Sequence, residues 1–195
     1  MPYPSGHAEK SKAKIVEAAR CLFNAHGFEK VTIDMVMKEA GLTRGGFYRH
    51  FASKEVLYGA AVQSFLMGKG AEWRADAGVD PTNLSPEMGQ QMLDSYLSAK
   101  HLGELENQCP MIALPSDVAR QSPEVRQAYQ NLLTAMVWLF ESTQEGSAAK
   151  RRQRALAMSA LCVGGMVLAR TIPDSELSEE VRAAAYQAAS DLTKT

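Results

Sequence analysis

The residues best suited to binding chemistry lie in one segment, TIDMVMKEAGLTRGGFYRHFASKE, which runs from Thr32 to Glu55. Its pattern predicts two short helices on either side of Gly41, and two helices joined by a short glycine-containing turn form a helix-turn-helix. Phe47 and Phe51 are four residues apart, so they share one face of the second helix and are expected to anchor it. The remaining side chains of that helix are polar, small or cationic, which favours a surface that binds DNA.

The second short helix carries the groups that could distinguish base pairs. An arginine such as Arg44 can donate two hydrogen bonds to O6 and N7 of guanine, and the methyl group of Thr43 can contact thymine. Gly45 and Gly46 each destabilise a helix by about 1 kcal/mol relative to alanine. Their presence is explained if the backbone must approach DNA closely.

Other groups in the segment suit the phosphate oxygens of DNA. Tyr48, Lys54 and the free amides at the helix starts of Thr32 and Ser53 are of this kind. His50 can contact a phosphate or merely close the helix end. The residues that we expect to contact DNA are Thr32, Thr43, Arg44, Gly45, Gly46, Tyr48, Arg49, His50 and Lys54.

Residues 10–60 resemble the DNA-binding domain of the TetR family of transcriptional regulators. The stretch AGLTRGGFYRHFASKEVL is similar to that family's signature of a glycine turn, Thr or Ser, a basic residue, Gly, an aromatic or Leu, Tyr, then His or Tyr, Phe and Ser-Lys-Glu. The positions that match are Thr32, Gly41, Tyr48, Phe51 and Lys54. The resemblance implies a homodimer that binds double-stranded operator DNA, acts as a repressor and is released by a small-molecule effector.

Helical periodicity dominates the whole chain and predicts an all-α fold of about nine helices. The expected organisation is a disordered tail over residues 1–9, a three-helix DNA-binding domain over 10–55, and a helical bundle over 56–195 that binds the effector and dimerises. Thr43 is expected to cap the third helix, and Ser178 the last one. Residues 1–59 carry 9 Lys/Arg and 6 Asp/Glu (+3), whereas residues 60–195 carry 12 and 16 (−4), so the basic part is the one expected to face phosphates.

The C-terminal part contains methionine and aromatic side chains that could line an effector pocket. Methionine is common on adaptable binding surfaces, and small-molecule pockets are mostly apolar. Packing in the core is the alternative for each single residue. The effector-binding residues that we expect are Phe65, Trp73, Met92, Tyr96, Met111, Met136 and Phe140.

The resemblance also implies that the two long C-terminal helices pair with those of a second copy. Small residues in the penultimate helix would let two helices approach closely. The dimer contacts that we expect are Leu156, Ser159, Ala160, Gly164, Val167 and Tyr186.

Several other classes of function are disfavoured by the composition. Cys21, Cys109 and Cys162 lack disulfide or zinc-ligand spacing, and no catalytic constellation or cofactor motif is visible, so we expect no enzyme activity, cofactor or metal. The longest apolar run, residues 158–169, is too short to span a bilayer, and no secretory signal is visible, so a cytoplasmic protein is expected. Two alternatives stay open: a regulator that senses redox state or electrophiles through Cys109, and a small-molecule carrier or enzyme that uses the C-terminal pocket.

Overall fold

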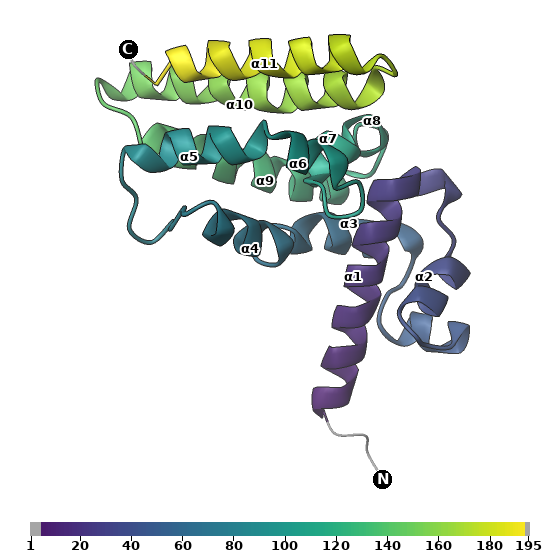
Figure 1. Cartoon of the computed structure of the whole chain (residues 1–195). Coiled ribbons are helices and arrows are strands. Elements are labelled where there is room, and N and C mark those ends of the chain that lie inside the picture. Colours follow the sequence, from purple (N-terminus) through teal and green to yellow (C-terminus); the bar gives the residue numbers. More distant parts are fainter. Residues whose placement is uncertain (1–4, 194–195) are drawn as a thin grey trace. The chain divides into compact units, whose positions relative to one another are not determined.

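The structure, a computed structural model, describes residues 5–193. Over this range the chain forms eleven α-helices and one 3-10 helix, with no strand, which confirms the predicted all-α fold (Figure 1). The chain divides into two compact units, and the first contains residues 1–69 together with 105–130. The second unit contains residues 70–104 and 131–195.

The first unit begins with four elements. These are α1 (Ser5–Lys30), α2 (Ile33–Glu39), η1 (Arg44–Arg49) and α3 (Lys54–Ser64). Because α1 begins at Ser5, the tail expected over residues 1–9 is helical from that residue on; residues 1–4 lie outside the described residues. Gly27 interrupts α1 with a φ of 77°, a conformation that glycine adopts without the strain of a Cβ atom.

An aromatic cluster forms the centre of the first unit. The ring of Tyr58 on α3 lies 4.8 Å from that of Phe23 and 5.0 Å from that of Phe28, measured between centroids. All three rings are buried. Burial, followed by the charge of Asp117, raises the pKa of Tyr58 well above its ordinary value, so its hydroxyl stays neutral.

Two short helices and a loop from residues 105–130 complete this unit. The helices are α7 (Pro110–Ala113) and α8 (Pro115–Val118), and α9 (Pro123–Ser142) begins in the same unit. The backbone amide of Phe28 donates a hydrogen bond of 2.9 Å to Oδ2 of Asp117 on α8. Pro115 separates α7 from α8, because it has no amide hydrogen with which to continue a helix.

Buried polar side chains of α1 hold the loop before α7. Arg20 is only 2% exposed, and its guanidinium donates to the carbonyl oxygen of Glu106 at 3.0 Å and to Oδ1 of Asn107 at 3.0 Å. Asn24 donates to the carbonyl oxygens of Glu106 and Gln108. The first unit therefore depends on contacts between segments more than 80 residues apart in sequence.

The second unit is a helical bundle. Its elements are α4 (Lys69–Asp76), α5 (Glu87–Tyr96), α6 (Ala99–Gly103), the rest of α9, α10 (Ala148–Thr171) and α11 (Ser175–Asp191). Figure 1 shows α10 and α11 side by side, in green and yellow. A Cβ atom added to Gly165 would lie only 2.5 Å from Cβ of Ala185, so this close packing of α10 on α11 requires glycine there.

The start of α11 differs from the sequence prediction. Asp174, not Ser178, caps the helix, because its carboxylate accepts hydrogen bonds from the amides of Glu176 and Leu177. Ser178 lies one turn inside the helix, and its hydroxyl donates to the carbonyl oxygen of Ala169 at 2.8 Å.

One described helix, α10, has the length and hydropathy of a membrane span. Length and hydropathy alone do not show that α10 spans a membrane, because the core helix of a soluble protein passes the same test. Side chains of α10 such as Met158, Cys162 and Met166 are fully buried within the protein.

Candidate nucleic-acid interface

The helix-turn-helix is formed by α2 and η1. The hydroxyl of Thr32 accepts a hydrogen bond of 3.2 Å from the amide of Met35, so this side chain caps α2 as its type and position predict. Val36 and Met37 bury the inner face of α2. Gly41 ends the helix with a φ of 69°, which starts the turn toward η1.

The second helix of the motif is a 3-10 helix rather than the predicted α-helix. The side chain of Thr43 makes no capping hydrogen bond; its carbonyl oxygen accepts from the amide of Gly46 at 3.0 Å. Two consecutive glycines weaken the preference for α-helix, and the tighter winding is common in pieces this short. The predicted anchoring is confirmed, since Phe47 and Phe51 are buried with ring centroids 5.9 Å apart.

Most of the residues expected to contact DNA are exposed around this short helix. The exposed fraction is 65% for Tyr48 and 68% for the side chain of Arg44, and Arg49 is exposed as well. A Cβ atom added to Gly45 would meet no atom within 4 Å, so the backbone there is open to close approach. The structure thus places residues 44–49 on η1, with Thr43 and His50 at its two ends and Thr32 at the start of the preceding helix.

Lys54 has a structural role that the sequence does not predict. Its ammonium donates hydrogen bonds to the carbonyl oxygens of Phe28, at 2.9 Å, and Val31, at 3.2 Å. It also lies 4.1 Å from the centroid of the Phe28 ring, within the range of a cation–π interaction. The phosphate contact expected of Lys54 is therefore revised, because two of its three N–H groups are already bound within the first unit.

Asp34 is a site residue that the sequence interpretation missed. Its Oδ2 accepts a hydrogen bond of 2.7 Å from Nη1 of Arg44, which forms an ion pair between α2 and η1. Both side chains are more than half exposed. An acid in the first turn of a helix is commonly explained by the helix dipole alone. Asp34 and Arg44 are ten residues apart, and this spacing does not predict an ion pair.

The residues expected to bind an effector divide between the two units. Phe65 and Met111 belong to the first unit, and the other five belong to the second. All are buried except Trp73, which is half-buried. Within the second unit Trp73, Tyr96 and His101 form an aromatic cluster with centroid distances of 4.9–5.7 Å.

A small cavity of about 110 Å³ adjoins this cluster. It is lined by Trp73, Asp76, Ala77, Ser95, Ser98, Lys100, His101 and Glu104. Nδ1 of His101 lies 2.8 Å from the carbonyl oxygen of Tyr96, and burial lowers the pKa of this imidazole. A ligand in this cavity would meet a neutral imidazole, an indole and several polar groups.

The residues expected at a dimer interface have two different environments. Leu156 and Ala160 are exposed on α10, and Gly164 and Val167 are half-buried there. Ser159 is only 1% exposed and donates to the carbonyl oxygen of Ala155, so the structure contradicts its predicted place in an interface. The hydroxyl of Tyr186 donates to Asp94 within the same unit.

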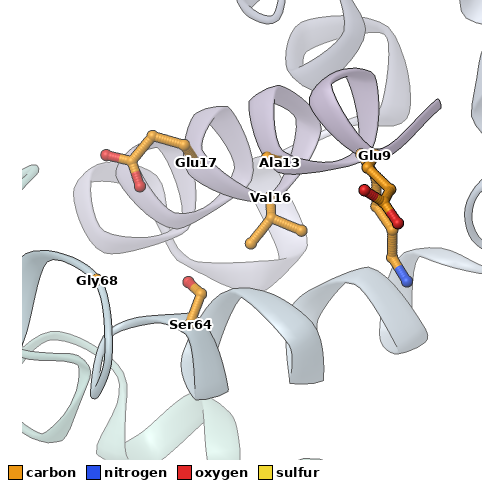
Figure 2. A pocket seen from close by; sticks show the side chains of 7 residues that line it. Glu9, Ala13, Val16, Glu17, Ser64 and Gly68 are labelled. Atoms are coloured by element: carbon orange, nitrogen blue, oxygen red, sulfur yellow. The ribbon is translucent and has the colours of Figure 1, made fainter. Parts of the chain in front are cut away.

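The first unit has a groove between α1 and α3 (Figure 2). It has a volume of about 380 Å³ and a mostly apolar lining. Figure 2 shows Val16 on α1 and Ser64 on α3 pointing toward each other, with Glu9 and Glu17 along the groove. Two carboxylates, of Glu9 and Glu17, and one ammonium, of Lys12, line the groove, so it has no excess of positive charge for phosphate and is not part of the candidate DNA surface.

Comparison with known proteins agrees with this geometry. The family profile described as bacterial regulatory proteins, tetR family, matches residues 15–61, which include α2, η1 and most of α3. Residues 15–61 are therefore similar to the N-terminal segment of TetR-family regulators. The HTH-type transcriptional regulator YfiR of Bacillus subtilis is 38% identical over 60 residues, which are 31% of this chain and 29% of YfiR. The chain thus matches less than a third of that relative's length.

Solved structures of TetR-family regulators share the fold along nearly the whole chain. A regulator from Cytophaga hutchinsonii superposes with a TM-score of 0.76 at 18% identity, covering 99% of this chain and 97% of its own. A TetR transcriptional regulator from Chloroflexus aurantiacus gives a TM-score of 0.74 at 22% identity, covering 93% and 95%. These likenesses extend the fold assignment beyond the matched N-terminal segment.

We predict that Lys54→Met lowers the free energy of unfolding by about 1.5–3 kcal/mol, because two carbonyl groups lose a charged donor. Chemical denaturation followed by circular dichroism measures this change. Lys38→Met is the matched control, since Lys38 is exposed near the end of α2. Equal stability of the Lys54 and Lys38 variants would refute the structural role.

Proposed function

We propose that the chain is a transcriptional regulator, a repressor in the cytoplasm, that binds operator DNA through α2 and η1. The observation that carries this proposal is the exposed, cationic and glycine-containing surface of η1, held in place by two buried phenylalanines. A short helix with small residues fits the major groove, where arginine can bind guanine. A gel-retardation assay distinguishes this proposal from the alternative of a carrier or enzyme, because only a DNA-binding regulator is expected to retard DNA.

The phosphate contacts can be tested by the salt dependence of binding. We expect Arg49→Ala to weaken binding to operator and random DNA alike, and to make the negative slope of log K against log salt concentration shallower by about 0.9. Tyr48→Phe should weaken binding without changing that slope, because tyrosine carries no charge. Arg126→Ala is the control, as Arg126 is exposed on α9. An unchanged slope for Arg49→Ala would remove this residue from the phosphate contacts.

We further propose that the second unit binds a small-molecule effector beside Trp73 and His101. The cavity of about 110 Å³ is lined by Trp73, His101 and several polar side chains, so it favours a small ligand that is more polar than the mostly apolar effector pocket expected from the sequence. Effector and operator affinities would then be coupled reciprocally. Cys109 is a buried thiol outside any disulfide, which does not favour the redox alternative.

An effector can be identified by a screen for compounds that raise the melting temperature. In the Trp138→Phe variant, where Trp73 is the one remaining tryptophan, we expect such a compound to quench fluorescence and to release operator DNA. In the matched Trp73→Phe variant the quenching of Trp138 should be absent. A compound that releases DNA but quenches only Trp138 would place the effector site elsewhere.

We propose that the dimer forms through the outer face of α10 and α11. A groove of about 450 Å³ runs between these helices, with a lining made almost entirely of small and apolar residues. The lining residues are Ala160, Leu161, Gly164, Gly165, Leu168, Val181, Ala184 and Ala185. Leu156 and Leu168, 46% and 56% exposed, are large apolar side chains at this surface. Burial of such a face against a second copy is favourable, and a dimer matches the twofold symmetry of operator half-sites.

Two neighbouring glycines test this interface against the fold. A Cβ atom on Gly164 would meet nothing within 4 Å, so Gly164→Leu should leave the subunit folded but obstruct the partner, giving monomers in light scattering. Gly165→Leu should instead destabilise the subunit by about 3 kcal/mol or more, because its Cβ would overlap Ala185. A wild-type protein that is monomeric at micromolar concentration would overturn the proposed interface.

A further inference from the structure

We propose that Asp34 positions Arg44 for the recognition of a guanine, by holding one edge of the guanidinium while the other edge faces the DNA. This inference rests on the proposed function, that the surface of α2 and η1 binds DNA. It assigns Asp34 the role of a positioning residue and makes guanine, bound by Arg44, one determinant of the operator sequence.

The ion pair joins α2 to η1. Asp34 lies in the first turn of α2, where the Thr32 cap fixes the backbone. Arg44 is the first residue of a 3-10 helix that continues with two glycines. The 2.7 Å bond from Nη1 of Arg44 to Asp34 is the one hydrogen bond of this guanidinium within the part of the chain that the structure describes. The carboxylate thus restrains a side chain that is otherwise free to rotate in solvent.

The pattern of donors determines what the restrained arginine can bind. A guanidinium has five N–H donors in one plane, and Asp34 takes one of them through Nη1. The Nε and Nη2 groups then present two parallel N–H donors on the opposite edge. This pair matches O6 and N7 of guanine in the major groove, whereas adenine offers N7 as an acceptor but an amino donor in place of O6.

The carboxylate also affects binding that does not depend on sequence. Its negative charge lies on a surface that must approach phosphates, so it opposes electrostatic attraction to any DNA. Fixing Arg44 lowers the conformational entropy lost when a base is bound. Asp34 therefore weakens binding to random DNA while it strengthens discrimination at one base pair.

The experiment is a selection of binding sites from random duplex DNA with the full-length wild-type protein, followed by affinities for single-base variants of the selected site. The protein variants are Arg44→Ala, Asp34→Asn and the double variant. Glu39→Gln is the matched control, because Glu39 is also an exposed acid on α2. Circular dichroism and thermal melting check that each variant is folded.

We expect Arg44→Ala to lose preference for one G·C pair, with discrimination falling about tenfold. Asp34→Asn should lose preference at the same pair and bind random DNA about two- to fivefold more tightly. The double variant should lose no more discrimination than Arg44→Ala, because both residues act through one contact, and Glu39→Gln should keep the wild-type site.

Two results would overturn this role of Asp34 while leaving the proposed function intact. One is an unchanged preference in Asp34→Asn. The other is a change at a different base pair, which would mean that Asp34 itself accepts a hydrogen bond from cytosine. A wild-type protein that selects no site and does not retard DNA would instead refute the proposed function.

Discussion

The arrangement of the first unit depends on how the backbone groups at the end of α1 are hydrogen-bonded. After Gly27 breaks the helix, the carbonyl oxygens of Phe28 and Val31 have no helical partner, and the ammonium of Lys54 binds both. A lysine at the start of α3 therefore connects the end of α1 to the residue before the Thr32 cap of α2. Because a buried carbonyl without a donor is destabilising, this single cation fixes where α2 begins and hence where η1 is presented.

One side of η1 is packed against the first unit, and the other side is exposed to solvent. Phe47 and Phe51 are buried in the first unit, whereas Arg44 and Gly45 are exposed and Gly46 is half-buried. A 3-10 helix has poorer hydrogen-bond geometry than an α-helix, so the backbone of η1 is held less firmly than that of an α-helix. The ion pair with Asp34 restrains the side chain of Arg44, whose direction determines which group its guanidinium can bind.

The sequence predicts the local features of this site well and its long-range features poorly. The caps at Thr32 and Ser53, the turn at Gly41 and the anchoring phenylalanines depend on neighbours within a few residues, so residue type and spacing were sufficient. The roles of Lys54 and Arg20 depend on carbonyl groups distant in sequence, which no local pattern reveals. The cap at Asp174 was missed because a serine followed by two glutamates gives an equally good local signal four residues later.

The hydrogen bond from the Phe28 amide to Asp117 has a consequence for how such regulators can be recombined. The carboxylate that ends α1 comes from a helix almost ninety residues further along the chain, and Oδ2 of Asp117 would lie 2.9 Å from a Cβ atom at Gly27. Residues 1–69 are thus completed by the segment 105–130 of the same unit. A hybrid that joins residues 1–69 to the body of a TetR-family regulator would inherit an open helix end, unless the donor supplies an acid at the position of Asp117 and the loop that Arg20 and Asn24 bind. Exchange of residues 1–69 between relatives is therefore constrained by a short segment that lies outside this continuous sequence.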